Sequence, residues 1–187
     1  MKKALKNSAE LKLQVANTMT EKISEAAKLV SNAMKNGKKV MLCGNGGSAA
    51  DSQHLAAELV VRLTGKVNRN ALPGMALTTD TSILTAASND FGFENVFSRQ
   101  IEAHGVKGDV LIALSTSGNS PNIMKAVDTA KETGIITIGL LGNAGGKLGP
   151  LVDLPVIVPS KDTQRIQEAH ITIGHIIIQL VENRLSK

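Results

Sequence analysis

The stretch VMLCGNGGSAAD, residues 40–51, decides the fold of this chain. Its first four residues are all apolar, which is typical of a strand buried on both faces, and a glycine-rich turn follows at once. Ser48 and Asp51, three residues apart, resemble a capping box and predict that a helix begins at Ser48. Free backbone amides between a strand and a helix N-terminus favour an anion, so this turn is a candidate phosphate or polyol site.

Strand-like and helix-like stretches alternate through the rest of the sequence. Short, nearly continuous apolar runs predict five strands, at residues 40–43, 75–78, 110–114, 135–141 and 156–158. Helices are expected around them, at residues 48–63, 94–103, 121–133 and 162–185. This alternation predicts an α/β fold with a doubly wound, parallel five-stranded sheet flanked by helices. The polar segment 65–74, which contains Pro-Gly, predicts a surface loop.

The N-terminal part of the chain predicts helix rather than strand. Apolar side chains recur at three- and four-residue intervals from Ala4 to Met34, which indicates one long amphipathic helix or two in succession. Asn36-Gly37 is expected to end it, because glycine suits a left-handed cap. With 187 residues, the chain is expected to form a single domain over residues 1–187, in which residues 1–36 are the N-terminal helical segment.

Composition argues against several functional classes. The formal charge is +5, but Lys and Arg are scattered and neither Trp nor Tyr is present to stack on bases, so no nucleic-acid partner is expected. No apolar stretch approaches the roughly 18 residues of a membrane span, so no membrane partner is expected either. A single cysteine, Cys43, cannot form an internal disulfide and is expected as a small buried strand residue. These features predict a cytoplasmic protein.

A second candidate anion site is the loop STSGNSP, residues 115–121. It follows a strongly apolar strand and ends with Ser120 at a capping position and Pro121 at the first helical position. Hydroxyls and free amides at a helix N-terminus stabilise a phosphate dianion, although the same residue types also serve as ordinary turn residues. The earlier loop also matches the dinucleotide pattern G-x-G-x-x-A from Gly44, but the acidic residue expected about 20 positions later is missing, which argues against NAD.

Several further side chains could move protons. His54 and Glu58 are four residues apart and share one helix face, where such a pair can bind a divalent metal, carry out acid/base chemistry or form a surface pair. On the C-terminal helix, His175 lies about 80° around and about 12 Å along from Gln167, so the two share a broad face without being adjacent. His175 could equally be a core residue, and His170 is expected to be a packing residue.

Taken together, these motifs resemble the SIS (sugar isomerase) family, and within it the phosphoheptose isomerases, from about residue 5 to residue 185. The resemblance rests on five strings in the same order: CGNGGS (43–48), QHLAAE (53–58), SNDFGF (88–93), STSGNS (115–120) and RIQEAH (165–170). It implies the SIS fold. It also implies isomerisation of the ketose sedoheptulose 7-phosphate to the aldose D-glycero-D-manno-heptose 7-phosphate, which feeds the biosynthesis of heptose-containing glycans such as lipopolysaccharide.

The same resemblance implies roles for individual residues. Those expected to hold the sugar phosphate are Asn45, Gly46, Gly47, Ser48, Glu58, Asn89, Asp90, Ser115, Thr116, Ser117, Ser120 and Gln167. Glu58 and His175 are expected to be the acid/base catalysts: Glu58 would take a proton from C1 of the open-chain ketose, and His175 would shuttle protons at the oxygens. One zinc ion per subunit is expected, with His54, Glu58, Gln167 and His175 as its ligands.

The resemblance further implies a homotetramer with active sites between subunits, in which residues 1–36 take part in packing. An alternative from another class stays open, because SIS folds also serve as non-catalytic tetrameric regulators that bind a replication initiator protein or a sugar phosphate. The initiator-binding relative lacks counterparts of Glu58 and His175, and both are present here, which favours the enzyme. A second alternative is an isomerase that acts on a hexose or pentose phosphate.

Overall fold

The centre of the fold is one sheet of five parallel strands, in the order β2-β1-β3-β4-β5. The computed structural model describes residues 1–65 and 67–185 of the chain. The strands are β1 (Val40–Cys43), β2 (Gly74–Ala76), β3 (Val110–Ser115), β4 (Ile136–Leu141) and β5 (Leu154–Ile157). The predicted α/β class and the five-stranded parallel sheet are therefore confirmed, with shifts of one or two residues at some strand ends.

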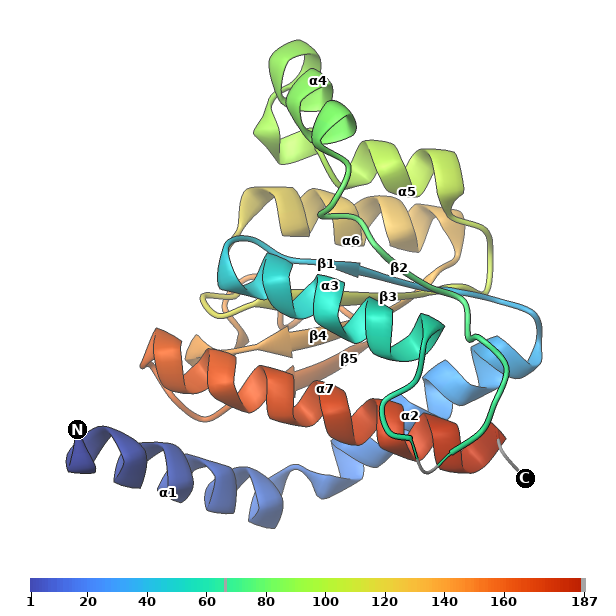
Figure 1. Cartoon of the computed structure of the whole chain (residues 1–187). Coiled ribbons are helices and arrows are strands. Elements are labelled where there is room, and N and C mark those ends of the chain that lie inside the picture. The colour runs from blue at the N-terminus through green and yellow to red at the C-terminus, as the bar shows by residue number, and fades with distance from the viewer. Residues whose placement is uncertain (66, 186–187) are drawn as a thin grey trace.

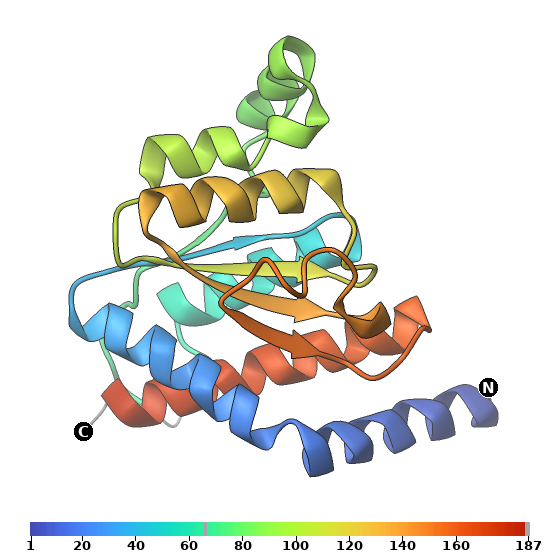
Figure 2. The same ribbon diagram turned by 180° about the vertical axis from the view of Figure 1, so that it is seen from behind.

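Helices cover both faces of this sheet (Figures 1 and 2). The described α-helices are α1 (Lys2–Thr18), α2 (Thr20–Lys35), α3 (Gly47–Val60), α4 (Thr81–Phe91), α5 (Ser98–His104), α6 (Pro121–Thr133) and α7 (Thr163–Leu185). Two short 3₁₀ turns follow β-strand or helix ends, η1 (Phe93–Asn95) and η2 (Asn143–Gly145). The helices α1, α2, α3 and α7 pack on one face, whereas α5 and α6 pack on the other.

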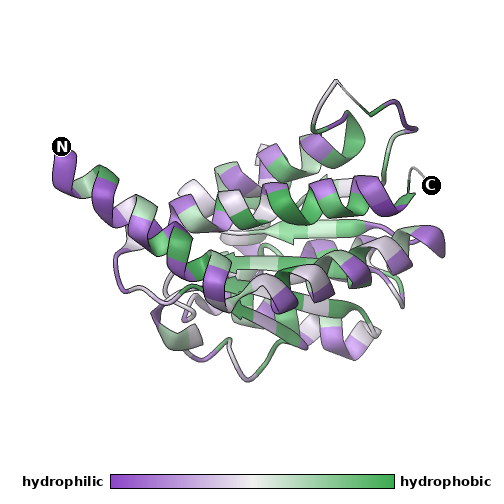
Figure 3. Ribbon diagram, turned by 90° about the horizontal axis from the view of Figure 1, so that it is seen from below, coloured by the Kyte–Doolittle hydropathy of each residue, from purple (hydrophilic) through white to green (hydrophobic). Residues whose placement is uncertain are grey.

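Successive strand residues point into two separate apolar cores. Leu42 and Ile112 belong to the core under α2, α3 and α7, whereas Met41 and Leu111 belong to the core under α5 and α6. Every residue of β1 and β3 is buried, which explains why these strands are apolar throughout instead of alternating with polar residues. Figure 3 shows the hydrophobic strands between helices whose outer faces are hydrophilic.

The N-terminal segment is two helices that meet at Met19. Leu11 and Val15 of α1 are buried, but Leu5 and Leu13 keep 68% and 65% of their surface exposed, so α1 retains apolar surface on this chain. The end of α2 matches its prediction. The amide of Gly37 donates to the carbonyl of Met34, and the next amide donates to Ala33, which is a glycine-terminated helix cap.

Two local predictions were wrong, and one helix was not predicted. The capping box at Ser48 does not form: α3 begins one residue earlier because Gly46, at φ 57°, turns the chain, and Ser48 is buried inside the first turn. The helix expected over residues 94–103 is instead η1 followed by α5. Helix α4 was not predicted, because its sequence TSILTAASNDF is rich in residues that favour caps and turns; its N-cap, Asp80, accepts a hydrogen bond from the amide of Ile83.

The loop predicted over residues 65–74 includes Lys66, which lies outside the described residues. Its described residues before Gly74 form no helix or strand. Among the residues that the structure describes, no helix combines the length and apolar character that crossing a membrane requires.

Candidate active site

The two glycine- and serine-rich loops lie side by side at the carboxyl edge of the sheet. One follows β1 and the other follows β3, and these strands are neighbours. Their side chains also join them: the amides of Asn45 and Asn122 exchange two hydrogen bonds, each 2.8 Å long. Asn122 lies in the first turn of α6 and is buried, so the pair fixes the first loop to the start of this helix. The carboxyl edge of a parallel sheet is where such folds bind ligands.

Three serine hydroxyls converge in the second loop. The hydroxyl of Ser115 lies 3.2 Å from that of Ser120 and 3.5 Å from that of Ser117, and it accepts a hydrogen bond from the amide of Gly118. Ser120 is the N-cap residue of α6, but its side chain makes no capping bond and faces Ser115 instead. Pro121 has no N–H, and the amide of Ile123 donates to the Ser120 carbonyl. The Asn122 amide makes no hydrogen bond to a described residue and, together with the hydroxyls, is available to an anion. Thr116 belongs to the same loop, where its carbonyl accepts from Asn143.

The predicted acid/base residues meet where α3 and α7 cross closely. Gly174 permits this approach, because a Cβ at that position would come within 2.6 Å of the Leu55 side chain on α3. Next to this contact, the Nε2 atoms of His54 and His175 lie 2.8 Å apart, with the two rings in an edge-to-face arrangement. The Nε2 atom of His54 also lies 3.5 Å from Oε1 of Glu58. His175 thus belongs to a polar cluster and is not a core residue.

The cluster of His54, Glu58 and His175 can hold a divalent metal ion. One ligand atom from each residue lies within 4.8 Å of the others. Within the described residues, the second carboxylate oxygen of Glu58 is buried and has no hydrogen-bond partner, so it is free to bind a cation or a proton. Two imidazole nitrogens and a carboxylate are a donor set that suits zinc and related metals.

Gln167 reaches the same region from two turns earlier on α7. Its side-chain amide packs against Gly47 at the start of α3, where any Cβ would collide with it. The Gln167 side chain approaches the backbone at residue 47 so closely that only glycine leaves room for it. The side chain also borders a cavity of about 330 Å³, lined by Asp51, Gln164, Arg165, Gln167, Glu168 and Ile171.

Asp51 is a site residue that the sequence analysis assigned only to capping. The pKa of its carboxyl is raised, because the effect of burial is larger than the opposing effects of the Gln167 amide and of the imidazoles of His54 and His175. Its Oδ2 atom is buried and makes no hydrogen bond to any described residue. The spacing of Asp51, His54 and Glu58, at i, i+3 and i+7, places all three on one helix face and was the signal available in the sequence.

Two other expectations concern buried groups. His170 is fully buried and packs as predicted; burial lowers the pKa of its imidazole to about 4, which the Leu141 backbone partly offsets. Cys43 is the buried strand residue that the sequence indicated, and burial raises the pKa of its thiol to about 12, which makes it unreactive.

Asn89 and Asp90 are not brought to this site within the single chain. They lie near the end of α4, where both are exposed and the Asn89 amide donates to the Asp90 carboxylate over 2.7 Å. Figure 1 shows α4 projecting away from α3 and α7. No hydrogen bond between described residues joins this pair to either anion loop.

Comparison with known proteins agrees with these motifs. Residues 5–142 match the SIS domain family. A phosphoheptose isomerase of Chlorobaculum parvum is 54% identical over 179 residues, which are 95% of this chain and 86% of that protein. The solved structure of phosphoheptose isomerase from Neisseria gonorrhoeae has a TM-score of 0.90 at 42% identity, covering 96% of this chain and 95% of that one.

A second solved structure, a phosphoheptose isomerase from Francisella tularensis, has a TM-score of 0.93 at 34% identity, over 97% of this chain and 96% of that one. The similarity therefore extends over nearly the whole chain in both sequence and fold. The resemblance drawn from the five sequence strings is confirmed, and the chain belongs to the SIS domain family and, within it, to the phosphoheptose isomerases.

Proposed function

We propose that this protein is an aldose–ketose isomerase that converts sedoheptulose 7-phosphate to D-glycero-D-manno-heptose 7-phosphate through an enediol. The observation that carries the proposal is the cluster of His54, Glu58 and His175, formed by α7 and by α3, which begins at the first anion loop. Seven residues of α3 separate Gly47 from His54, a rise of roughly 10 Å, which is of the order of an extended open-chain sugar phosphate.

The phosphate would lie between the two loops. The dianion would accept hydrogen bonds from the hydroxyls of Ser115, Ser117 and Ser120, and from the amide of Asn122 in the first turn of α6. Backbone amides of residues 45–47, held in place by the Asn45–Asn122 pair, would contact the sugar phosphate from the other side. Because loop amides and hydroxyls would bind the phosphate at one end of the substrate, the carbon chain of the sugar would extend along α3, with C1 and C2 at the cluster of His54, Glu58 and His175.

Glu58 would be the base. Its carboxylate takes the proton from C1 of the ketose, the C1–H electron pair forms the C1–C2 double bond, and the C2 carbonyl oxygen gains a proton to give the enediol. Glu58 then returns a proton to C2, while the C1 hydroxyl loses its proton and becomes the aldehyde oxygen. His175 would carry the protons between the two oxygens. One proton is removed from carbon and one is returned to carbon, so no oxidant or reductant is needed.

We also propose that the metal bound here is zinc, held by His54, Glu58, Gln167 and His175. When bound, the ion would polarise the substrate carbonyl as a Lewis acid. Glu58 has a separate oxygen for each task, because Oε1 faces His54 and Oε2 is buried without a partner among the described residues. His54, His175 and Gln167 would be the other ligands, and replacing any of them would weaken metal binding even where phosphate binding persists.

A homotetramer would complete the site. Phe91 and Phe93, which flank the exposed end of α4, retain 53% and 57% of their surface, and a neighbouring subunit would cover them and receive Asn89 and Asp90. The apolar surface left on α1 would be buried in the same assembly, with residues 1–36 as its packing segment. We propose a single domain over residues 1–187 and a cytoplasmic location for this enzyme.

The test is turnover by the purified protein. Sedoheptulose 7-phosphate is supplied with and without zinc, hexose 6-phosphates and pentose 5-phosphates are the comparison substrates, and aldose formation is followed by NMR. We expect turnover of the heptulose phosphate, and loss of turnover in Glu58→Gln and His175→Ala while inorganic phosphate still binds. Binding of sugar phosphate without turnover by the wild type, under all metal conditions, would favour the non-catalytic regulator instead.

A further inference from the structure

A buried ion pair joins the loop after α3 to the end of α7. The Nε atom of Arg69 donates to Oε1 of Glu182 over 2.7 Å, and the two side chains are only 5% and 2% exposed. The same carboxylate oxygen accepts from the backbone amide of Leu63 at 3.1 Å. Charges this deeply buried persist only when they are paired and hydrogen-bonded, so this pair fixes the loop to α7.

The other nitrogens of the Arg69 guanidinium cap the C-terminal turn of α3. Nη2 donates to the carbonyl of Glu58 over 2.7 Å, and Nη1 donates to the carbonyl of Leu59 over 2.9 Å and to that of Asn70 over 3.0 Å. Because α3 ends at Val60, the carbonyls of Glu58 and Leu59 belong to the last turn, whose carbonyls lack helical amide partners. The Leu59 carbonyl also accepts from the amide of Leu72, whereas the Glu58 carbonyl receives its hydrogen bond from Arg69. Arg69 thus bonds the backbone of the residue whose side chain the proposed chemistry uses.

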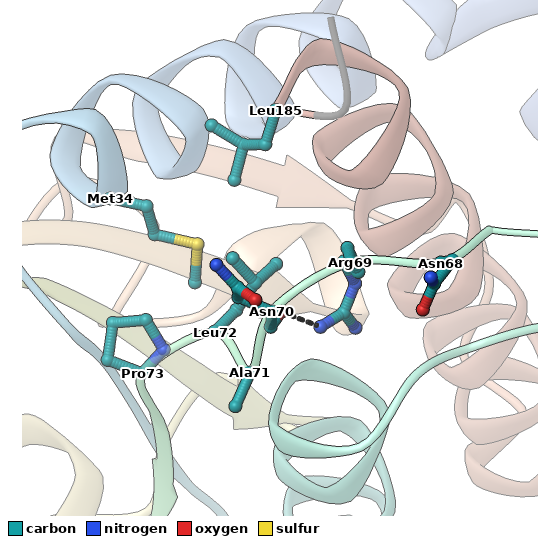
Figure 4. Close-up of a pocket in the computed structure, with 8 residues that line it drawn as sticks. All are labelled: Met34, Asn68, Arg69, Asn70, Ala71, Leu72, Pro73 and Leu185. Carbon is teal, nitrogen blue, oxygen red and sulfur yellow. Dashed lines mark hydrogen bonds between the residues drawn. The ribbon is translucent and has the colours of Figure 1, made fainter.

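A cavity of about 700 Å³ lies beside this arginine (Figure 4). It is lined by Met34, Asn68, Arg69, Asn70, Ala71, Leu72, Pro73 and Leu185. The guanidinium donates hydrogen bonds to Glu182 and to backbone carbonyls. Figure 4 marks the hydrogen bond to the Asn70 carbonyl. The arginine is therefore built into the structure and is not presented as a binding group for a ligand in the cavity.

We infer that Arg69 and Glu182 are positioning residues for the isomerase site. Glu182 follows His175 by seven residues, so the two lie on the same side of α7. Arg69 joins that side of α7 to the backbone of Glu58, and this connection sets the Glu58 carboxylate against His175 and His54. The inference rests on the proposed function, because it gives the pair a role in the geometry of the acid/base and metal-binding cluster.

The test removes the connection without leaving a buried charge. In the double variant Arg69→Met/Glu182→Leu, two apolar side chains replace the ion pair, an exchange that proteins often tolerate. Two single variants keep part of the connection. Arg69→Lys keeps the positive charge but loses the planar guanidinium that reaches the carbonyls of Glu58 and Leu59. Glu182→Gln keeps a side-chain oxygen that can accept from Arg69 and from the Leu63 amide. Arg184→Met is the matched control, because Arg184 lies two residues further along α7 and bonds to Ser24 on α2 instead of to α3.

Each variant is checked for helical circular dichroism and then measured in two ways. Steady-state kinetics give kcat and KM for sedoheptulose 7-phosphate, and a visible-absorption titration with Co²⁺ gives metal affinity without turnover. For the double variant and Arg69→Lys, we expect kcat and Co²⁺ affinity to fall about 10- to 100-fold, with KM within about twofold of the wild type. Arg184→Met should stay close to the wild type in both readouts. Glu182→Gln keeps the hydrogen bonds but leaves the Arg69 charge buried without a counter-charge, so its kcat and Co²⁺ affinity should fall less than those of the double variant.

A folded double variant with the kcat and Co²⁺ affinity of the wild type would overturn the inference, as would an unaffected Arg69→Lys. If the double variant does not fold, the comparison of Arg69→Lys with Arg184→Met decides the question. A wild type that binds Co²⁺ but does not isomerise the sugar phosphate would refute the proposed function alone. The Co²⁺ titration of the variants would still report on positioning.

Discussion

Replacing His170 tests how burial of one imidazole makes the protein sensitive to acid. His170 is fully buried on α7, and neither ring nitrogen makes a hydrogen bond of normal geometry to a described residue. Burial therefore favours the neutral ring and lowers its pKa from 6.5 to about 4. Between these values the unfolded chain binds a proton that the folded chain does not, so stability is present above pH 6.5 and is lost as the pH falls toward 4.

The two pKa values set the size of the effect. They imply that the free energy of unfolding falls by about 2 kcal/mol between pH 7 and pH 5, and by about 3 kcal/mol at pH 4, from this residue alone. In His170→Leu the proton-binding site is absent. The variant should therefore lose about 2 kcal/mol less than the wild type between pH 7 and pH 5.

Urea unfolding at pH 7, 6 and 5, at one protein concentration, measures this difference. His104→Leu is the control, because His104 is exposed at the end of α5 and its variant should keep the pH dependence of the wild type. Parallel pH profiles for the wild type and His170→Leu would refute the reasoning, since they would mean that the buried ring is protonated as easily in the folded protein as in the unfolded chain.

Three further predictions follow from the same structure. Burial raises the pKa of the Asp109 carboxyl, but hydrogen bonds from the Lys39 side chain and from backbone amides outweigh burial and lower the pKa overall. Asp109→Asn should therefore lower the free energy of unfolding in urea by about 1 to 3 kcal/mol at pH 7. The difference between this variant and the wild type should shrink as the pH falls below about 4. Ser120→Ala should weaken inorganic phosphate binding about 10-fold in calorimetry and raise KM with little change in kcat; an unchanged affinity would remove its hydroxyl from the phosphate site. His54→Ala should lower zinc affinity at least 10-fold in equilibrium dialysis while phosphate binding persists, and an unchanged zinc affinity would exclude His54 as a ligand.

Most of the sheet could be predicted from the sequence because buried parallel strands have a direct signature. Residues 40–43 and 110–114 are continuous apolar runs, and both became strands with every residue buried. Helix α4 was missed because its Thr, Ser, Asn and Asp residues do not distinguish a helix from a turn. The start of α3 was misplaced by one residue because backbone torsion at Gly46, and not the Ser48 side chain, decides where the helix begins.

The site could be predicted only in part. The spacing of His54 and Glu58 indicated a shared helix face, but their distance from His175 depends on the packing of Gly174 against Leu55, which no local pattern contains. Arg69 gave no signal, because its partner Glu182 is more than one hundred residues away and loop 65–74 lacks periodicity. Local sequence therefore predicts which residues are chemically able to act, and tertiary packing determines which of them meet.

The most direct test of the proposed chemistry is the fate of the C1 proton. Sedoheptulose 7-phosphate is incubated with the wild type and with Glu58→Gln in deuterated water, and deuterium at C2 of the aldose is measured by NMR. Proton removal by Glu58 predicts deuterium at C2 with the wild type, and a loss of turnover and of exchange by about 10²- to 10⁴-fold in the variant. Undiminished turnover by Glu58→Gln, or deuterium uptake at C2 by that variant at the rate of the wild type, would contradict it.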